Sequence, residues 1–290
     1  MDALQDFSQL LSHDFAQYPF LQRTLLAALL IGFSCSLLSV FVNAKRMAFL
    51  GQGISFAALP GLALGLWLYP ALSAPDTKVY AIALGFCFAA AWLMAWTSRK
   101  ETISEDAAIG VYFCVSMVLG QIFLAQRNGG EQIVDIAPYL FGSLASVSAQ
   151  ELYWLAGIAA AVLLAILFLY KEFFAFCFDP QYAALTGVPI RFLHYLLFFL
   201  LTAAAVFSVK AAGMVLVTSL LILPGACAAL TARRFANLFP IALVIGLVSS
   251  AAGVIAADRI ALKLPPSLFV ISILFGVFFL LSLLNRRKTA

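Results

Sequence analysis

Apolar residues are grouped into nine long segments along the chain, and short polar stretches separate each segment from the next. A helix needs roughly 20 apolar residues to cross a membrane, and each segment has about that length. The pattern therefore predicts an all-α, polytopic transmembrane helical bundle with eight or nine spans, which forms a single membrane domain over residues 1–290. The segments are 20–43, 53–70, 78–97, 106–125, 150–170, 192–209, 212–231, 237–257 and 266–285.

The number of spans depends on the short stretch at residues 208–213. Lys210 and Gly213 lie in this stretch. They allow either a tight exoplasmic turn between two spans or a break within one irregular span. The sequence leaves both arrangements open.

The composition agrees with lipid as the surroundings of this chain. Hydrophobic residues make up 64% of the sequence and charged residues only 10%, whereas a soluble domain carries about a quarter charged residues. The mean hydropathy is +1.04. A soluble enzyme is therefore excluded. The net charge of +4 is explained by basic residues at cytoplasmic helix ends, so no nucleic-acid partner is expected.

The distribution of lysine and arginine predicts the orientation in the membrane. With the amino terminus outside, eleven of the 17 basic residues lie on the cytoplasmic side, in agreement with the positive-inside rule. Residues 1–19 then form an exoplasmic segment, and residues 172–190 form a cytoplasmic loop. The first apolar run has no basic region before it, which favours a retained first helix over a cleaved signal peptide. We expect a multi-pass protein of the bacterial inner membrane.

The cytoplasmic loop at 172–190 contains signals for a short helix. Asp179 followed by Pro180 is typical of a helix start, and Gly187 followed by Pro189 is typical of a stop. The loop thus predicts a helix of one to two turns in the cytoplasm. Such a helix could dock a cytoplasmic protein, and the alternative is a simple amphipathic linker.

The second apolar segment carries two stripes of residues with helical spacing. Small residues recur at every fourth position, at Gly53, Ala57, Gly61 and Gly65. The neighbouring stripe contains Gln52, Phe56 and Pro60, with Ser55 one position away. Pro60 frees a backbone carbonyl that a neighbouring helix, a hydroxyl or cavity water must satisfy. We interpret the segment as an inner, pore-facing helix, although close helix packing alone would explain Gly61 and Gly65.

The sequence lacks the motifs of several enzyme classes and of coupled transporters. Ionisable residues avoid the middle of every segment, which argues against proton-coupled transport. No phosphate-binding loop, hydrolase motif or zinc-protease motif occurs, so we expect no catalytic residue and no cofactor, and ATP hydrolysis would need a separate subunit. His194 is expected at the inner interface with its ring toward water. His13 lies outside the membrane, so a histidine-built metal site within one chain is hard to assemble.

Several separated motifs resemble those of the permease family of manganese, zinc and iron ABC importers, in the same order and across nearly the whole chain. The motifs are YPFLQR at 18–23, KRMAFLGQGISFAALPG at 45–61, EDAAIG at 105–110, LFGS at 140–143, FDP at 178–180, LTGVP at 185–189 and LILPGA at 221–226. The resemblance implies a type II ABC importer fold. Two permease subunits, identical or different, would surround a central path, each above a cytoplasmic ABC ATPase, and an extracytoplasmic solute-binding protein would deliver the cargo.

The resemblance also assigns roles to individual residues. The translocation path would include Gln52, Ser55, Phe56 and Pro60. The loop at 178–189 resembles the coupling helix that seats in the ATPase, through Asp179, Pro180, Tyr182, Leu185 and Gly187.

One position pair departs from the family pattern. Family members commonly have an aspartate and a histidine, one helical turn apart, where this chain has Gln52 and Phe56. A glutamine carbonyl is a weak metal ligand and a phenyl ring is none. The expected cargo is a divalent transition metal (zinc, manganese or iron). A metal chelate or another small solute on the same fold is the alternative, and an ATP-independent secondary transporter or channel is the rival from a different class.

Overall fold

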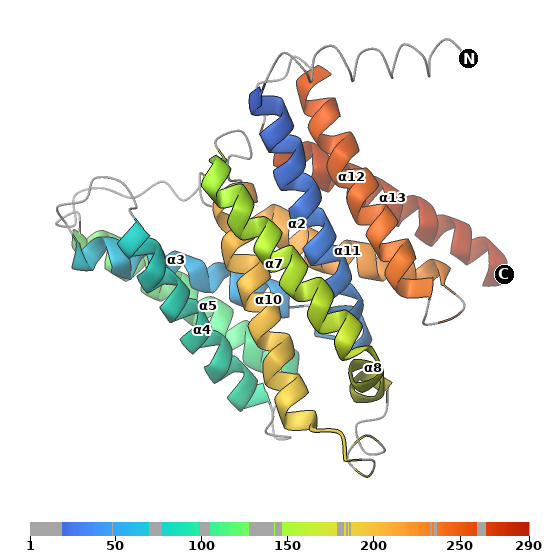
Figure 1. Cartoon of the computed structure of the whole chain (residues 1–290), viewed down its shortest axis with the longest axis horizontal. Helices are drawn as coiled ribbons and strands as arrows, with labels where there is room; N and C mark the ends of the chain where they lie inside the picture. Colours follow the sequence, from blue (N-terminus) through green and yellow to red (C-terminus); the bar gives the residue numbers. More distant parts are fainter. Residues whose placement is uncertain are drawn as a thin grey trace.

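Ten α-helices account for most of the residues that the structure, a computed structural model, describes, and no strand occurs among them (Figure 1). The described residues are 19–47, 49–69, 77–98, 105–127, 142, 147–178, 183, 185, 187–232, 234, 237–259 and 265–289. The helices are α2 (Pro19–Ala44), α3 (Leu50–Leu68), α4 (Thr77–Ser98), α5 (Glu105–Arg127), α7 (Ala149–Phe168), α8 (Tyr170–Phe178), α10 (Ile190–Ala212), α11 (Met214–Thr231), α12 (Leu238–Arg259) and α13 (Pro266–Thr289).

Eight of these helices are long and apolar enough to cross a membrane. Helix α4 has a shorter apolar stretch, Ala81–Thr97, and α8 has only nine residues. The predicted all-α bundle of eight or nine spans is therefore confirmed. The ends of α2 and α7 that we expect outside lie at the top of Figure 1, and α8 lies at the bottom with the start of α10.

The doubtful stretch at 208–213 contains two separate helices joined by one glycine. Helix α10 ends at Ala212, Gly213 adopts a positive φ of 82°, and α11 begins at Met214. Only glycine reaches this backbone region without steric cost. Both helices have the length of a span, so the first of the two predicted arrangements is present. Gly142 also has a positive φ, and its Cα lies so close to Gly213 that a side chain would not fit between them.

The centre of the molecule is the contact between α2 and α11. The side-chain amide of Asn43 donates to the carbonyl of Ser39 on its own helix, at 2.8 Å, and to the carbonyl of Ile222 on α11, at 2.9 Å. Gly225, one residue after the buried Pro224, lies directly against the Ser39 carbonyl. The sequence LPGA in α11 thus permits close approach of two backbones, the typical way in which helices associate in lipid.

Small residues also set the packing of the α3, α4 and α5 group, at the left of Figure 1. A Cβ atom added at Gly61 would lie 3.0 Å from Ala83 of α4, and one at Gly65 would lie 2.9 Å from Val79. At Gly53 it would lie 2.7 Å from Ile109 of α5. The packing interpretation of Gly61 and Gly65 is therefore confirmed, since both let α4 approach α3.

Candidate functional site

The four predicted path residues lie on two different faces of α3. Ser55 is completely buried, and its hydroxyl oxygen has no hydrogen-bond partner among the described residues. Ala58 and Leu62 follow Ser55 at helical spacing and line a cavity. Gln52, Phe56 and Pro60 share the other stripe.

The Gln52 stripe packs against α5 within the chain. The Phe56 ring lies 4.6 Å from the Phe113 ring, at an interplanar angle of 77°. Such an edge-to-face contact is a favourable aromatic geometry. Gly120 of α5 approaches Leu59 and Pro60 closely enough that no side chain would fit there. Phe56 thus forms an aromatic pair at a position where the family resemblance would put a metal-binding side chain.

The described residues contain no group of three or more His, Cys, Asp or Glu side chains that could hold a metal ion. Gln52 is half-buried and can offer one amide oxygen. All five cysteines are free thiols, and three of them are buried. The ligands that usually surround a divalent metal ion are therefore not gathered at one place within the described part of the chain.

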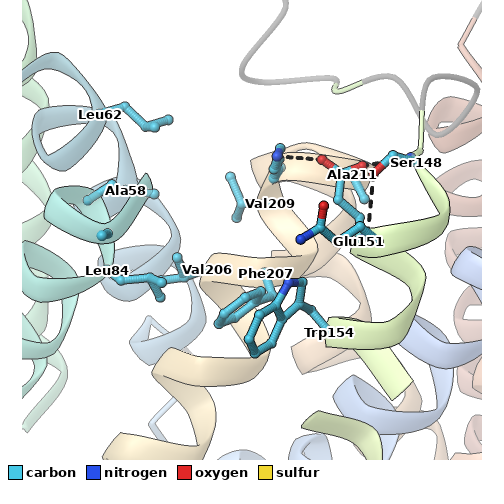
Figure 2. A pocket seen from close by; sticks show the side chains of 14 residues that line it. Ala58, Leu62, Leu84, Ser148, Glu151, Trp154, Val206, Phe207, Val209 and Ala211 are labelled. Atoms are coloured by element: carbon cyan, nitrogen blue, oxygen red, sulfur yellow. Dashed lines mark hydrogen bonds and ion pairs between the residues drawn. The ribbon is translucent and has the colours of Figure 1, made fainter. Parts of the chain in front are cut away.

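The cavity lined by Ala58 and Leu62 has a volume of about 330 Å³ (Figure 2). Helices α3 and α4 form one wall, and α7 and α10 form the other. Figure 2 shows Leu62 and Ala58 on the first wall, opposite Glu151 and Trp154. The lining is mostly apolar, and its charged members are Glu151 and Lys210.

Glu151 and Lys210 form an ion pair that joins α7 to α10. Glu151 is also part of a capping box, in which the Ser148 backbone N–H donates to Glu151 Oε2 at 2.9 Å and the Glu151 N–H donates to Ser148 Oγ at 3.3 Å. Both carboxylate oxygens are therefore engaged. The pair fixes the start of α7 against the end of α10, close to the Gly213 break.

The predicted coupling segment is described only in part. Asp179, Pro180 and Tyr182 lie outside the described residues. Ala183 and Leu185 are helical; Ala183 is buried, whereas Leu185 is 87% exposed. Gly187 has a positive φ of 81°, and the next N–H, that of Val188, donates to the carbonyl of Ala183 at 3.0 Å. This is a typical glycine-terminated helix end, so the predicted stop at Gly187 is present.

The sequence matches the model of one known protein family, described as "ABC 3 transport family", over residues 17–285. The chain belongs to this family. It is accordingly an integral, multi-pass protein of the bacterial inner membrane, and the resemblance drawn from the motifs is confirmed.

Curated relatives of this ABC 3 family chain include two named transport proteins. The "Chelated iron transport system membrane protein YfeD" of Yersinia pestis is 33% identical, over 92% of this chain and 86% of its own length. The "Manganese transport system membrane protein MntC" of Halalkalibacterium halodurans is 34% identical, over 86% of this chain and 80% of its own. Among solved structures, "PsaBC from Streptococcus pneumoniae in complex with Fab" is similar with a TM-score of 0.76 and 26% identity, covering 96% of this chain and 95% of the other.

The expectation for His194 is wrong. Its side chain is only 5% exposed, and its Nε2 atom lies 3.2 Å from the carbonyl oxygen of Ala95 on α4. The ring also lies 4.9 Å from that of Phe198. A position near a helix end does not reveal whether a side chain points to water or to a neighbouring helix, because the neighbour is set by tertiary packing. In this ABC 3 chain His194 joins α10 to α4.

Sequence reasoning missed the cavity and its ion pair. It placed ionisable residues away from the middle of every segment and Lys210 in the doubtful stretch at 208–213, and it did not pair Lys210 with Glu151. One signal for the ion pair was available, namely opposite charges on the same predicted side of the membrane. The capping sequence Ser148, Ala149, Gln150, Glu151 could have shown that Glu151 begins a helix.

Replacing Lys210 with methionine is expected to destabilise this family member by about 1 kcal/mol, because the Glu151 carboxylate would lose its counter-charge in a half-buried site. The free energy of unfolding in detergent measures the effect. A double-mutant cycle with Glu151→Gln provides the control, since the two losses should not add if the groups interact. If the stability losses of the two single variants added up exactly in the double variant, the Glu151–Lys210 interaction would be contradicted.

Proposed function

We propose that this chain is the membrane-spanning permease of an ATP-driven importer, and that its cargo is a divalent transition metal such as manganese or iron. The observation that carries the proposal is similarity over most of the chain to relatives named as manganese and chelated-iron transport membrane proteins. The family match over residues 17–285 and the similarity to PsaBC agree with it. The chain itself supplies the path and the docking surfaces, and hydrolyses no ATP.

The energy source would be a cytoplasmic ABC ATPase. The sequence has no phosphate-binding loop of its own. Leu185, 87% exposed on a helix that ends at Gly187, is an apolar side chain suited to a protein pocket. We assign ATPase coupling to the segment that ends at Gly187, through Asp179, Pro180, Tyr182, Leu185 and Gly187. An extracytoplasmic binding protein and a second permease subunit, most simply a copy of this chain, complete the proposed importer.

The path would run along α3. Ser55 supports this assignment, because its buried hydroxyl oxygen has no hydrogen-bond partner among the described residues, and Ala58 and Leu62, which follow it at helical spacing, line the cavity. Phe56 and its contact with Phe113 favour a second candidate, import of a metal chelate, because an aromatic surface suits an organic ligand better than a bare ion. The name of the YfeD relative gives that candidate further support.

Transport assays test the proposed function. The chain, its cognate ATPase and its binding protein are reconstituted in liposomes, and uptake of radioactive Mn²⁺ is followed with and without ATP. We expect uptake that needs ATP and stops when the ATPase carries an inactivating substitution in its phosphate-binding loop. Uptake that persists without the ATPase would favour the secondary transporter or channel and contradict the proposal. ATP-dependent uptake of an iron chelate without Mn²⁺ uptake would favour the chelate candidate.

The double substitution Gln52→Asp with Phe56→His is expected to lower the apparent KM for Mn²⁺ about tenfold, because a carboxylate and an imidazole one turn apart bind Mn²⁺ better than an amide and a phenyl ring. The initial rate of ATP-dependent Mn²⁺ uptake measures it. Leu64→His, two helical turns beyond Phe56 and so about 12 Å further along the helix axis, is the control and should leave KM unchanged. An unchanged KM in the double variant would remove Gln52 and Phe56 from the path.

A further inference from the structure

Residues 45–47, which follow α2, form a hydrogen-bonded turn, called the α2–α3 turn below. The Arg46 N–H donates to the carbonyl of Asn43 at 3.1 Å, and the Met47 N–H donates to that of Val42 at 3.0 Å. Arg46 adopts a positive φ of 58°, which is uncommon for a residue other than glycine, and the Met47 side chain is fully buried. Movement of the turn would therefore be passed on to α3, which starts at Leu50.

Lys45, at the start of this turn, lies over an aromatic ring of α8. Its Nζ atom is 3.8 Å from the centroid of the Phe176 ring, a cation–π contact. Phe176 is almost completely buried, so the contact is shielded from water and is stronger than one at the surface. A lysine that only satisfied the positive-inside rule would extend into the cytoplasm instead.

Helix α8 has further contacts on both sides. The Phe173 ring lies 4.9 Å from the Phe41 ring in the last turns of α2. The Phe176 ring lies 6.3 Å from the His194 ring of α10. Thus Phe176 stands between the α2–α3 turn and the helix that follows the cytoplasmic loop. Lys45 is the polar side chain that joins it to the turn.

The Lys45–Phe176 contact lies between two segments to which we assign functions. Helix α8 ends at Phe178, immediately before the segment to which we assign ATPase coupling. The α2–α3 turn leads into the first turn of α3, which holds Gln52. The Lys45–Phe176 contact therefore lies between the proposed coupling helix and the proposed path.

We propose that Lys45 is a positioning residue for transport. Through Phe176, it passes the movement of the cytoplasmic helix ending at Gly187 to the first turn of α3. This inference rests on the proposed function, because it assumes that an ATPase moves that helix. The cation–π contact holds the turn and α8 together as the two move.

A cysteine reporter tests the link without reference to the cargo. Gln52→Cys is introduced together with Cys114→Ser, which removes the exposed native thiol. Burial raises the pKa of the Cys177 thiol, near Lys45, to about 12, so this thiol stays protonated and unreactive toward maleimide. The complex with the cognate ATPase is incubated either with ADP or with ATP and vanadate, and is then labelled with a water-soluble maleimide. The Cys114→Ser chain that keeps Gln52 gives the background labelling.

We expect ATP and vanadate to change the labelling rate of the reporter at least about fivefold, a usual size for coupling between two sites. Lys45→Gln should abolish this change, and Lys45→Arg should keep it because a guanidinium also binds to an aromatic face. Lys171→Gln is the matched control, since it removes an exposed positive charge from α8 and should have no effect. Phe176→Leu, which removes the aromatic face, should behave like Lys45→Gln.

Four outcomes would overturn the inference: no ATP-dependent change in the reporter, an unaltered change in the Lys45→Gln variant, an equal loss in the Lys171→Gln variant, or no recovery with arginine. A second readout is the number of ATP molecules hydrolysed per Mn²⁺ imported, which Lys45→Gln should raise severalfold while ATPase binding stays constant. If the unmodified complex imports no Mn²⁺, the cargo assignment fails, whereas the labelling arm still decides the role of Lys45.

Discussion

Replacing Gly225 with valine is expected to lower the free energy of unfolding by about 2 to 4 kcal/mol, one of the largest effects of a single substitution in this protein. A side chain at this position would overlap the Ser39 carbonyl and lie within 2.5 Å of the Asn43 amide nitrogen. Helix α11 would have to move away from α2, and the Asn43 bond to Ile222 would be lost with the close packing. Thermal unfolding in detergent, together with the monodisperse fraction in size-exclusion chromatography, measures the loss.

Gly157→Val is the matched control for this prediction. Gly157 lies in the middle of α7, and a Cβ atom there would meet open space. The same change of residue type should therefore leave stability nearly unchanged. If both valine variants lost the same stability, the α2–α11 contact would not be the cause, and the general effect of valine in place of glycine would explain the result.

Replacing Leu185 with aspartate is expected to weaken binding of the cognate ATPase about a hundredfold. This leucine is 87% exposed on a helix that ends at Gly187, as expected for an anchor residue that enters a pocket of the partner. Replacing such an anchor with a charged residue weakens the binding free energy by about 2 to 4 kcal/mol. Titration of the ATPase against the permease in nanodiscs measures the affinity. The transport rate should fall in parallel.

Asn237→Asp provides the control for the docking prediction. Asn237 is exposed just before α12, on the same predicted side of the membrane, and the substitution also introduces a negative charge. Its affinity for the ATPase should stay within about twofold of the parent, as for surface substitutions away from an interface. An unchanged affinity in the Leu185→Asp variant, with the chain correctly folded, would remove this helix from the coupling surface.

Helix α3 packs differently on its different faces. Gly61 and Gly65 bring α4 close, Gly53 brings α5 close, and Ala58 and Leu62 line the cavity. The stripe of small residues is thus structural, whereas the Ser55 hydroxyl lies on a separate face. Phe56 packs on Phe113 of α5 within this chain.

The sequence alone determined the class of protein, the number of spans to within one, and the helix stop at Gly187, whereas it left two arrangements open at Gly213. These features follow from local rules, because span length is set by the thickness of the bilayer and a positive φ favours glycine. The family motifs, which occur in order along the chain, gave the importer fold. The separation of Gly61 and Gly65 by one helical turn also predicted close helix packing.

Tertiary structure decided which distant residues meet. It brought Glu151 to Lys210, Asn43 to Ile222, and Lys45 to Phe176. It also buried His194, which sequence position had placed at the water interface. In a chain that is apolar on every face of its helices, periodicity does not show which face turns inward. The physical reason is that helix association in lipid depends on close fit and on single interhelical hydrogen bonds, and these are properties of pairs of helices rather than of one segment.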